Sequence, residues 1–589
     1  MHIPTLGCVA LASAFMAVPA LAATYRVGTG TGCTHATIQA AVDAAAVTAT
    51  ADEIHVSQSQ AYTQQTILID QAQGALVLGG GYATCLADTP GAGQRTVISG
   101  ASPLPVLRIR RSRDVHLQDL DIRDGHAAGF GGGLDITGSG GAVVLLGNTW
   151  VRGNQANTGG GISISNTDAA GDPADVQLLL FGDSAVVSNT ANSGGGIFCA
   201  RATLQVFDHG HVSLNTASGG YGGGIHAQDC RVKLGSSGLA GAVLWANAAP
   251  LASGGGLYVA GPFGEADLYT VDPAQPLRVV GNSAYSGAAI ALSADARVAI
   301  YDGIIEDNVA SGAGGAIFVY PGTGAHADTR FLMQGTTLGA PPAAVNCAVA
   351  EACNRIRGNS AEGVGGMRMP GAAIVVDAAV AGSAHVTLRG TRLDGNVGAS
   401  LAHHADDHGQ ISFDGALLDG NFVDGPLLDA PGSANSLVLA ASTVAYNSIG
   451  LGRAVIGGVG SCDIASDYLG THVYRSIVWQ PGHNLIALAS PAQVQCFQYV
   501  IGNQFGGVPP SSNLVVADPA FVDAAHGDFR PGAASPVLDF APAQPANSTR
   551  DRGVRVVDLP GDGDQFGPQD LGAYEIRAER IFVDGFDPP

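Results

Sequence analysis

Charge is scarce in this chain of 589 residues, because Asp, Glu, Lys and Arg together make up only 13 %. Soluble domains usually contain about 25 %. Lysine is nearly absent: Lys233 is the only one, and the other basic residues are arginine. With 27 basic and 49 acidic residues the net charge is −22. A surface of this sign repels nucleic acids and anionic membranes, so we expect no nucleic-acid partner.

Several motifs and patterns are also missing. Beyond the N-terminus no apolar run reaches the ~18 residues of a membrane helix, which predicts no membrane span in the mature chain. No Gly-X-Y period is present, which excludes collagen. The chain lacks a G-x-S-x-G nucleophile motif, a G-x-x-x-x-G-K-[ST] phosphate loop and the Cys/His spacing of a zinc site.

The N-terminus has the pattern of a secretory signal. Leu6–Val18 is an apolar run with small residues, and Pro19-Ala20-Leu21-Ala22-Ala23 follows as an A-x-A-type cleavage site. We therefore predict that residues 1–23 are a signal peptide. The mature protein is then exported to the extracellular space or the outer cell surface, with the periplasm as the alternative.

Cysteine usage agrees with export. Removal of the signal peptide takes away Cys8 and leaves an even number of cysteines, as expected for a disulfide framework in an oxidising compartment. The sequence does not fix their connectivity, but pairing sequence neighbours is the economical choice. The predicted pairs are Cys33 with Cys85, Cys199 with Cys230, Cys347 with Cys353, and Cys462 with Cys496.

Glycine is abundant, with 85 residues, and much of it lies in a recurring box of three small residues followed by Leu or Ile. The copies begin at Gly131, Gly159, Gly194, Gly222, Gly254, Gly287, Gly314 and Gly371. An aliphatic residue, two variable residues and then Asn form a second box. Its asparagines are Asn154, Asn189, Asn215, Asn247, Asn282, Asn308, Asn359, Asn396, Asn421 and Asn447.

Between the boxes lie short apolar or alternating runs, such as Val176–Phe181, that are typical of strands and leave no room for crossover helices. One coil of a parallel β-solenoid fits this period. The predicted fold class is all-β: a right-handed parallel β-helix with a short N-terminal capping helix. Stacked at one bend, the asparagines would form a structural ladder of amide hydrogen bonds, and Asn tolerates the left-handed conformation of sharp bends. A ligand-binding row of asparagines is the alternative.

The segment Thr37–Ala45 predicts a short amphipathic helix that covers the first coil. Its T-I-Q-x-A-[VI]-x-x-A pattern resembles the start of secreted right-handed parallel β-helix proteins. The predicted organisation is an N-terminal cap at 24–50, parallel β-helix repeats at 51–510, a closing segment at 511–575 and a short tail at 576–589.

The two repeated boxes resemble the polymorphic outer-membrane protein repeat, G-G-A-[ILV] with F-x-x-N, although Val, Leu or Ile stands here in place of Phe. The resemblance implies a surface-exposed β-helix with a role in adhesion. Asp518-Pro519-Ala520-Phe521 and Asp570–Glu575 resemble the closing segment of bacterial β-helix proteins of the choice-of-anchor kind. No alternating ~10-residue strands near the C-terminus predict the membrane barrel of the outer-membrane family.

Candidate catalytic residues do not gather at one place in the sequence. Asn166-Thr167-Asp168 and Asp406-Asp407-His408-Gly409 match fragments of the galacturonan hydrolase signature, but about eight coils separate them. A calcium-dependent lyase needs an acidic cluster and a basic residue, and the neighbours of Lys233 do not form such a cluster. Arg108 and Arg110 share one strand face and suit an acidic glycan or a solvated surface. We therefore predict no catalytic residue.

Two clusters carry ligand types that suit metals. His403-His404-Ala405-Asp406-Asp407-His408 is the densest, with an exposed loop as the alternative. Asp562, Asp564 and Asp570 resemble a calcium loop, with an Asp/Gly turn as the alternative, and structural calcium is the only cofactor that the sequence suggests.

From these observations we expect an exported, non-catalytic and monomeric β-helix protein that serves adhesion or glycan binding. Its partner would be a polysaccharide or the surface of a host or neighbouring cell. The alternative is a polysaccharide lyase or glycoside hydrolase that acts on an acidic polysaccharide.

Overall fold

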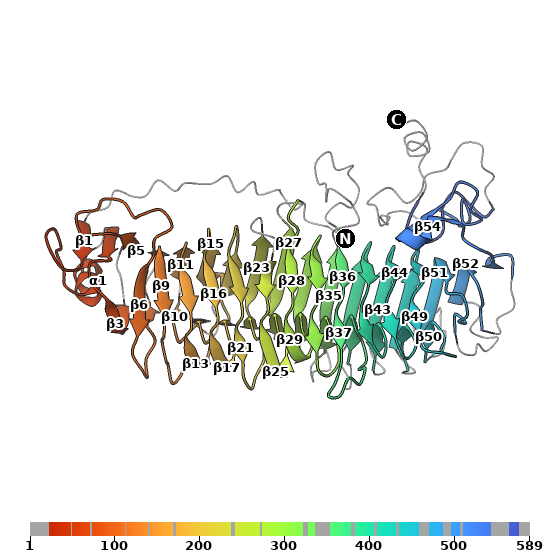
Figure 1. Ribbon diagram of the computed structural model, residues 1–589, viewed down its shortest axis with the longest axis horizontal. Helices are drawn as coiled ribbons and strands as arrows, with labels where there is room; N and C mark the ends of the chain where they lie inside the picture. The colour runs from red at the N-terminus through yellow and green to blue at the C-terminus, as the bar shows by residue number, and fades with distance from the viewer. Residues whose placement is uncertain are drawn as a thin grey trace, which may run out of the picture.

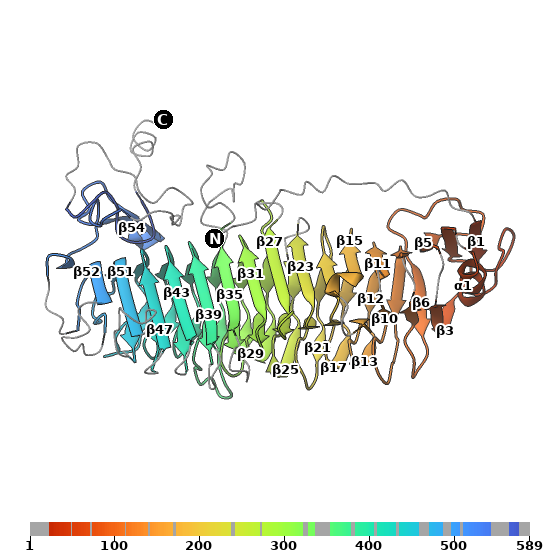
Figure 2. The same cartoon turned by 180° about the vertical axis from the view of Figure 1, so that it is seen from behind.

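The computed structural model describes residues 23–575, except 49, 71–73, 112–113, 140–141, 169–171, 237–241, 271–273, 322–327, 336–353, 378–382, 406–408, 432–434, 459–469, 487–495, 507–510 and 544–564. Parallel strands stack coil upon coil into a long rod (Figure 1). Figure 2 shows the same regular stack from behind. The predicted fold class, an all-β parallel β-helix, is confirmed.

Each coil has four straight segments, which we call faces 1 to 4. A representative coil runs through β11 (Ala142–Gly147) on face 1, β12 (Trp150–Arg152) on face 2, β13 (Gln155–Thr158) on face 3 and β14 (Ile162–Asn166) on face 4. Faces 1 and 2 belong to one sheet of 30 strands, while face 3 is a sheet of 10 and face 4 a sheet of 13 strands.

The strands of faces 1 and 2 are joined by a short bend in each coil. Face 1 consists of β1 (Ala23–Val27), β2 (Asp52–Ser57), β5 (Leu76–Tyr82), β8 (Val115–Gln118), β11, β15 (Val176–Phe181), β19 (Thr203–Val206), β23 (Arg231–Ser236), β27 (Glu265–Thr270), β31 (Arg297–Tyr301), β35 (Asp328–Gln334), β39 (Ser383–Arg389), β43 (Gly409–Asp414) and β47 (Asn435–Ala440). In the last coils β51 (Gly470–Trp479) and β52 (Phe497–Gly502) each run through faces 1 and 2 as one strand, and β53 (Leu514–Val516) pairs with the face 2 part of β52. Face 2 consists of β3 (Tyr62–Gln65), β6 (Thr96–Gly100), β9 (Leu120–Arg123), β12, β16 (Ala185–Val187), β20 (His211–Ser213), β24 (Ala242–Trp245), β28 (Arg278–Val280), β32 (Ile304–Glu306), β36 (Arg355–Arg357), β40 (Arg392–Asp394), β44 (Leu417–Asp419) and β48 (Thr443–Ala445).

Faces 3 and 4 complete the coil. Face 3 consists of β13, β17 (Thr190–Ser193), β21 (Thr216–Ala217), β25 (Ala248–Ser253), β29 (Ser283–Ser286), β33 (Val309–Ala310), β37 (Ser360–Ala361), β41 (Val397–Gly398), β45 (Phe422–Val423) and β49 (Ser448–Ile449). Face 4 consists of β4 (Ile67–Asp70), β7 (Leu107–Arg110), β10 (Leu134–Gly138), β14, β18 (Ile197–Ala200), β22 (Ile225–Gln228), β26 (Leu257–Ala260), β30 (Ile290–Ser293), β34 (Ile317–Tyr320), β38 (Ile374–Val376), β42 (Ala402–His404), β46 (Leu428–Asp429) and β50 (Ile456–Gly457).

Alternation along each strand decides which side chains enter the core. On β15, Val176, Leu178 and Leu180 are fully buried, while Gln177 and Phe181 lie on the outer side. The same inward positions stack from coil to coil, so one hydrophobic core runs the length of the rod, from Val27 to Leu514. Side chains on the outer side therefore form long rows, one residue from each coil.

The predicted capping helix is present as α1 (Ile38–Ala46), one residue later at its C-terminal end than expected. Thr37 is its N-cap, and the Thr37 side chain accepts a hydrogen bond from the amide of Ala40. Ile38, Val42 and two alanines of the helix are buried with the first coils. The helix thus covers apolar surface at the N-terminal end of the solenoid, which an open coil would expose.

The glycine boxes join face 3 to face 4, and each position has its own reason. Gly159 has a φ of +66°, in the left-handed region that favours glycine. A Cβ atom on Gly160 would lie 2.4 Å from the carbonyl oxygen of Gly195 in the next coil. The first glycine therefore makes the turn, and the second allows the coils to approach closely.

The ten boxed asparagines lie at the bend between faces 2 and 3, and all are buried. The side-chain Nδ2 of each donates to the Oδ1 of the next over 2.8–3.0 Å. The same Oδ1 accepts a second hydrogen bond from the backbone amide of the preceding asparagine, over 2.9–3.1 Å. Asn447 ends the ladder and binds Gln480 in the same way.

The left-handed residue at this bend is not the one expected. None of the ten ladder asparagines has a positive φ; the residue before each of them does, with values from +51° to +65°. These residues are Gly153, Ser188, Leu214, Ala246, Gly281, Asp307, Gly358, Gly395, Gly420 and Tyr446. Each asparagine must direct its side-chain amide along the stack to reach the next coil. The residue before it therefore adopts the left-handed conformation that makes the sharp turn.

A second ladder, built from hydroxyl groups, lies at the bend between faces 1 and 2. The amide of Thr149 donates to Ser184 Oγ over 3.2 Å, and that of Ser442 donates to Ser476 Oγ over 3.1 Å. Ser184 Oγ in turn donates to the carbonyl oxygen of Leu146 over 2.8 Å. This ladder is interrupted along the rod, so its hydroxyl residues form no regular repeat in the sequence.

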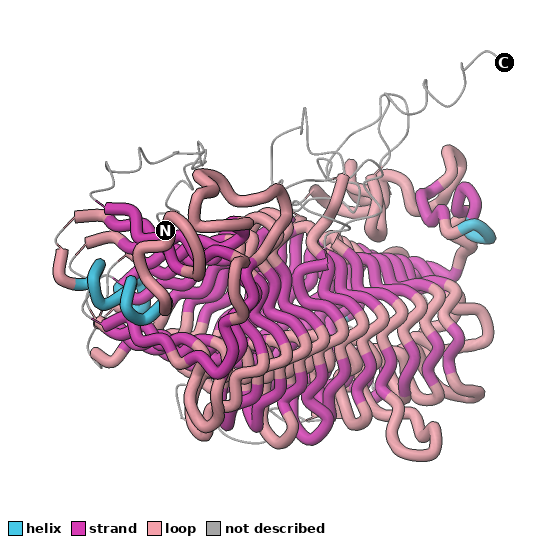
Figure 3. Tube along the Cα trace, turned by 60° about the vertical axis from the view of Figure 1, so that its left-hand side comes forward, coloured by secondary structure: helices cyan, strands magenta, loops and turns pink. Residues whose placement is uncertain are grey.

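The predicted closing segment folds back along the side of the rod. It contains β54 (Phe521–Asp523) and β55 (Asp528–Pro531), the only antiparallel pair among the described strands. Phe529, Ala573 and Tyr574 are buried there with Leu417 and Ala445 of face 2. Figure 3 shows this segment lying against the outside of the stacked strands.

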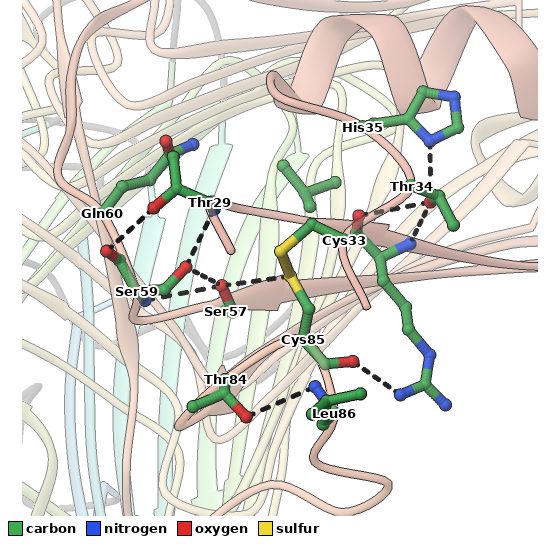
Figure 4. The surroundings of a disulfide bond; sticks show 12 residues. Thr29, Cys33, Thr34, His35, Ser57, Ser59, Gln60, Thr84, Cys85 and Leu86 are labelled. Atoms are coloured by element: carbon green, nitrogen blue, oxygen red, sulfur yellow. Dashed lines mark hydrogen bonds between the residues drawn. A yellow bond between two sulfur atoms is a disulfide. The ribbon is translucent and has the colours of Figure 1, made fainter. Parts of the chain in front are cut away.

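Two predicted disulfides are confirmed. Cys33–Cys85 joins the N-terminal cap to the loop after β5, beside Ser57 of β2 (Figure 4). Cys199–Cys230 links one coil to the next within the core. Cys496 is also disulfide-bonded, whereas Cys347, Cys353 and Cys462 lie outside the described residues. Among the described residues no helix has the length and apolarity needed to cross a membrane.

Candidate functional site

The residues singled out in the sequence do not meet in one site. The ten ladder asparagines are buried and bonded to one another, so they are not presented to a ligand. Asn166 and Asp168 form a local turn in which the Asp168 amide donates to Asn166 Oδ1 over 2.9 Å. Arg108 forms an ion pair with Asp135 of the next coil over 3.1 Å. This contact is typical of a charged outer face.

The candidate metal ligands are only partly described. Asp562, Asp564 and residues 406–408 lie outside the described residues. Asp570 is buried within the closing segment, where its Oδ1 accepts a hydrogen bond from the Asp539 amide over 2.9 Å. His403 Nδ1 lies 2.9 Å from Asp429 of the neighbouring coil. Among the described residues no group of three or more His, Cys, Asp or Glu side chains could hold a metal ion.

Charged side chains on face 2 are engaged with one another. Arg152 pairs with Asp121 over 2.6 Å, and Arg392 pairs with Asp419 over 2.7 Å. Glu306 is buried and pairs with arginines from both adjacent coils. Such ion pairs between coils stabilise the stack and leave little capacity for a ligand.

Face 1 differs, because charged and aromatic side chains gather on the outer side of three successive strands, β23, β27 and β31. We call this group the face 1 cluster. It consists of Arg231, Lys233, Glu265, Asp267, Tyr269, Arg297 and Tyr301. Strand pairing places these residues in three rows: Arg231, Glu265 and Arg297; Lys233 and Asp267; and Tyr269 and Tyr301. Successive coils are separated by the ~4.8 Å of paired strands.

Several of these charges are free to meet a ligand. Lys233, Glu265 and Arg297 are exposed, and within the described part of the chain none of their side chains makes a hydrogen bond or ion pair. Arg231 pairs with Asp172 over 2.9 Å. Farther along the first row, Arg330 pairs with Asp328. The side chain of Glu265 on β27 therefore lies beside two coils that carry the cations Lys233 and Arg297, neither of which has an ion-pair partner among the described residues.

Burial and Glu265 raise the pKa of the Asp267 carboxyl, while Lys233 acts in the opposite direction. Burial and Asp267 likewise raise the pKa of the Tyr269 phenol, and burial with Asp267 and Glu265 raises that of Tyr301. The two tyrosines therefore stay neutral and can donate hydrogen bonds. Asp267 holds a proton more readily than a free aspartate does.

The third row of face 1 is aromatic. Phe207 follows β19 at the position next to Gly235, and its ring lies 6.5 Å from that of Tyr269, with Gly235 between them. A Cβ on Gly235 would lie 2.9 Å from the Tyr269 ring and 3.3 Å from the Phe207 ring. The missing side chain lets the two rings close over the strand. The row continues to Tyr301 on one side and Phe181 on the other.

Aromatic rings next to free carboxylates and cations suit a hydroxyl-rich ligand. Sugar rings pack an apolar face on an aromatic ring and exchange hydrogen bonds at their edges. The spacing between coils is close to the length of one sugar unit, so successive coils can meet successive units of an extended chain.

Lys233 stands out in the sequence, but the residues that lie beside it on the adjacent coils do not. The reason is that their proximity depends on which coil positions pair, and those positions are 32 to 34 residues apart in the chain. The sequence signal that could have revealed them is the set of outward-facing residues in each alternating run. These residues can be matched between coils by their distance in sequence from the preceding glycine box. No family model matches the chain, and no curated protein matches it in sequence.

Proposed function

We propose that the protein is an exported β-helix protein that binds an extended glycan along face 1, outside the cytoplasm. The observation that carries this proposal is the face 1 cluster, with its aromatic row and unpaired Lys233, Glu265 and Arg297. Free cations favour a glycan that carries carboxylates. The partner is a polysaccharide, free or on the surface of a host or neighbouring cell.

Two further observations support an extracellular setting. The disulfides Cys33–Cys85 and Cys199–Cys230 are typical of oxidising compartments, and the N-terminal sequence predicts a signal peptide. The resemblance to the polymorphic outer-membrane protein repeat and to choice-of-anchor closing segments favours a surface-associated adhesin. In this proposal the closing segment and the tail serve attachment or sorting.

The test is retention of the protein on immobilised acidic and neutral polysaccharides. We expect wild-type protein to be retarded by at least one, and a Tyr269→Ala/Tyr301→Ala variant to bind at least tenfold more weakly, since each ring contributes roughly 1–2 kcal/mol. Tyr285→Ala is the matched control, because Tyr285 is 54 % exposed on face 3. Equal retention of the double variant, or no retention of wild type, would contradict the proposal.

A second candidate function is hydrolysis of an acidic polysaccharide. Glu265 and Asp267 point to the same side of β27, with Cα atoms about 6.6 Å apart, and burial together with Glu265 raises the pKa of Asp267. Glycoside hydrolysis uses such a pair of carboxyl groups, one as the acid and one as the base or nucleophile. Release of reducing ends that is abolished in both Glu265→Gln and Asp267→Asn would establish this activity. Unsaturated products would instead indicate a lyase.

A further inference from the structure

A second aromatic group lies on face 4 of the same coils. The outward side chains of β18, β22 and β26 at paired positions are Phe198, His226 and Tyr258. Tyr221, from the turn before Gly222, completes the group, which we call the His226 site. The Tyr221 and Tyr258 rings are stacked with centroids 4.3 Å apart. The His226 ring meets Phe198 and Tyr258 edge to face, at 5.1 Å in each case.

The hydrogen bonds of His226 leave one nitrogen without a partner. Its Nδ1 lies 2.7 Å from Ser193 Oγ. The Ser193 hydroxyl donates to the carbonyl oxygen of Tyr221 over 3.2 Å. The Tyr221 carbonyl oxygen also accepts a hydrogen bond from the Gly194 amide over 2.9 Å, so the Ser193 hydroxyl can either accept from His226 Nδ1 or donate to it. In both tautomers Nε2 is buried with no hydrogen-bond partner among the described residues.

A buried ring nitrogen without a hydrogen-bond partner costs free energy, so the site gains from any ligand that brings a hydroxyl, which can both donate and accept. The side chains around His226 indicate the other chemical properties of such a ligand. Phe198 and Tyr258 offer apolar ring faces, and no charged side chain contributes to the shift in the His226 pKa, whose only cause is burial. An ionic ligand would find no counter-charge here. A neutral molecule with an apolar face and hydroxyl groups at its edge fits.

Tyr221 is the side chain that covers the site from outside. It is 43 % exposed, whereas His226 and Tyr258 are both more deeply placed. It also stands alone on its turn, between Gly220 and Gly222. Rotation of Tyr221 away from Tyr258 would free one face of the Tyr258 ring and open the way to His226 Nε2.

We propose that the His226 site binds a single neutral sugar unit, which replaces the Tyr221 ring on Tyr258 and forms a hydroxyl hydrogen bond with His226 Nε2. This site goes beyond the glycan face proposed above, because it lies on another face and takes one neutral unit instead of an extended chain. It does not require face 1 to bind anything.

The test uses methyl glycosides of glucose, galactose and mannose as probes, titrated into full-length protein with labelled histidine. We expect one of them to shift the ring resonances of His226 in the wild type. In Tyr221→Ala the competing ring is gone, and the same probe should bind several-fold more tightly. His226→Phe keeps the aromatic packing but lacks the ring nitrogen, and tryptophan and tyrosine fluorescence should then report at least tenfold weaker binding.

Two controls separate this site from face 1. Tyr285→Ala and Tyr269→Ala/Tyr301→Ala should leave the binding of the methyl glycoside unchanged. Absence of any shift in both wild type and Tyr221→Ala would overturn the proposal, as would equal affinity in His226→Phe. Loss of polysaccharide retention in the face 1 variant alone would concern only the extended glycan.

Discussion

The backbone amide of Ala573 donates a hydrogen bond to the hydroxyl of Thr443 over 3.0 Å, across 130 residues of sequence. This contact attaches the closing segment to β48 on the side of the rod. Phe529 and Tyr574 are buried beside it. The segment therefore covers face 2 near the Arg392–Asp419 ion pair.

Removal of the Phe529 side chain should loosen the closing segment before the rod unfolds. Phe529 is 2 % exposed, and Phe→Ala changes in a core cost about 3–5 kcal/mol. We expect Phe529→Ala to speed limited proteolysis between residues 512 and 575 while the circular dichroism of the rod is retained. Phe263→Ala is the control, since Phe263 is 66 % exposed. Unchanged proteolysis would mean that other contacts hold the segment.

Asn282 in the middle of the ladder should be far less replaceable than an exposed asparagine. Its Oδ1 accepts hydrogen bonds from the backbone amide and the side chain of Asn247, at 2.9 and 3.0 Å. Asn282→Ala leaves these buried donors unpaired, at about 1–3 kcal/mol each. We expect a clear fall in the denaturation midpoint and faster hydrogen exchange in the adjacent coils. The exposed Asn157→Ala should change neither, and similar behaviour of both variants would refute the importance of the ladder.

The left-handed residue before each ladder asparagine allows a test of backbone strain in both directions. Gly420 has a φ of +61°, and a Cβ there would meet nothing within 4 Å. Gly420→Ala should therefore cost only the conformational term of about 1–2 kcal/mol. Leu214 has a φ of +57° and is 45 % exposed, so Leu214→Gly should raise stability slightly. The thermal unfolding midpoints of the two variants measure both effects. A higher midpoint for Gly420→Ala would show that the backbone at the bend can leave the left-handed conformation without cost.

Acid should destabilise the protein partly through His226. Burial lowers the pKa of its imidazole to about 4, against about 6.5 in an unfolded chain. Between these values the unfolded state binds the proton and the folded state does not, so stability is full above pH ~6.5 and falls as the pH drops toward 4.

His226→Phe should therefore lose less stability than wild type between neutral pH and about pH 5, by roughly 2 kcal/mol. Asp419 acts in the opposite sense, because burial raises its pKa to about 6 and the folded state then holds the extra proton. Its contribution is common to both proteins and cancels in their difference. The free energy of unfolding is measured by urea denaturation at the two pH values. An equal loss in wild type and His226→Phe would contradict the role of His226.

The two disulfides should differ in their response to a mild reductant. Cys199 and Cys230 are both fully buried in the core, whereas Cys33 is partly exposed in the N-terminal cap. Thiol–disulfide exchange needs access to the sulfur. In native protein we expect Cys33 and Cys85 to be alkylated first, with Cys199 and Cys230 labelled only after unfolding. Simultaneous labelling in peptide mass spectra would show that the core opens readily.

Much of the fold was predictable because every coil must turn at the same places. A left-handed bend and a close approach between coils require small residues, and Gly159 and Gly160 are examples. A buried amide such as Asn282 must find partners in adjacent coils, so its repetition marks the period. The exact left-handed position was predicted wrongly, since a tolerant residue type such as Asn does not show which of two neighbours makes the turn.

The candidate sites were not predictable in the same way. Lys233, Asp267 and Tyr301 come from three coils, and His226 meets Tyr221 through a turn. The connections from face 4 to face 1 differ in length: nine residues separate β14 from β15, but only two separate β18 from β19. With such variation the sequence does not say which outward residues share a row.

The sequence by itself determined the repeating coil, the inward side chains and the capping helix, because each depends on local alternation or on a residue type required at a bend. Only the tertiary structure decided which outward side chains meet. Coil stacking sets the register that gathers Glu265, Asp267 and Tyr301 on face 1, and the folding back of the closing segment brings Ala573 to Thr443. These contacts join residues far apart in the chain, and hydrogen bonding between coils fixes them.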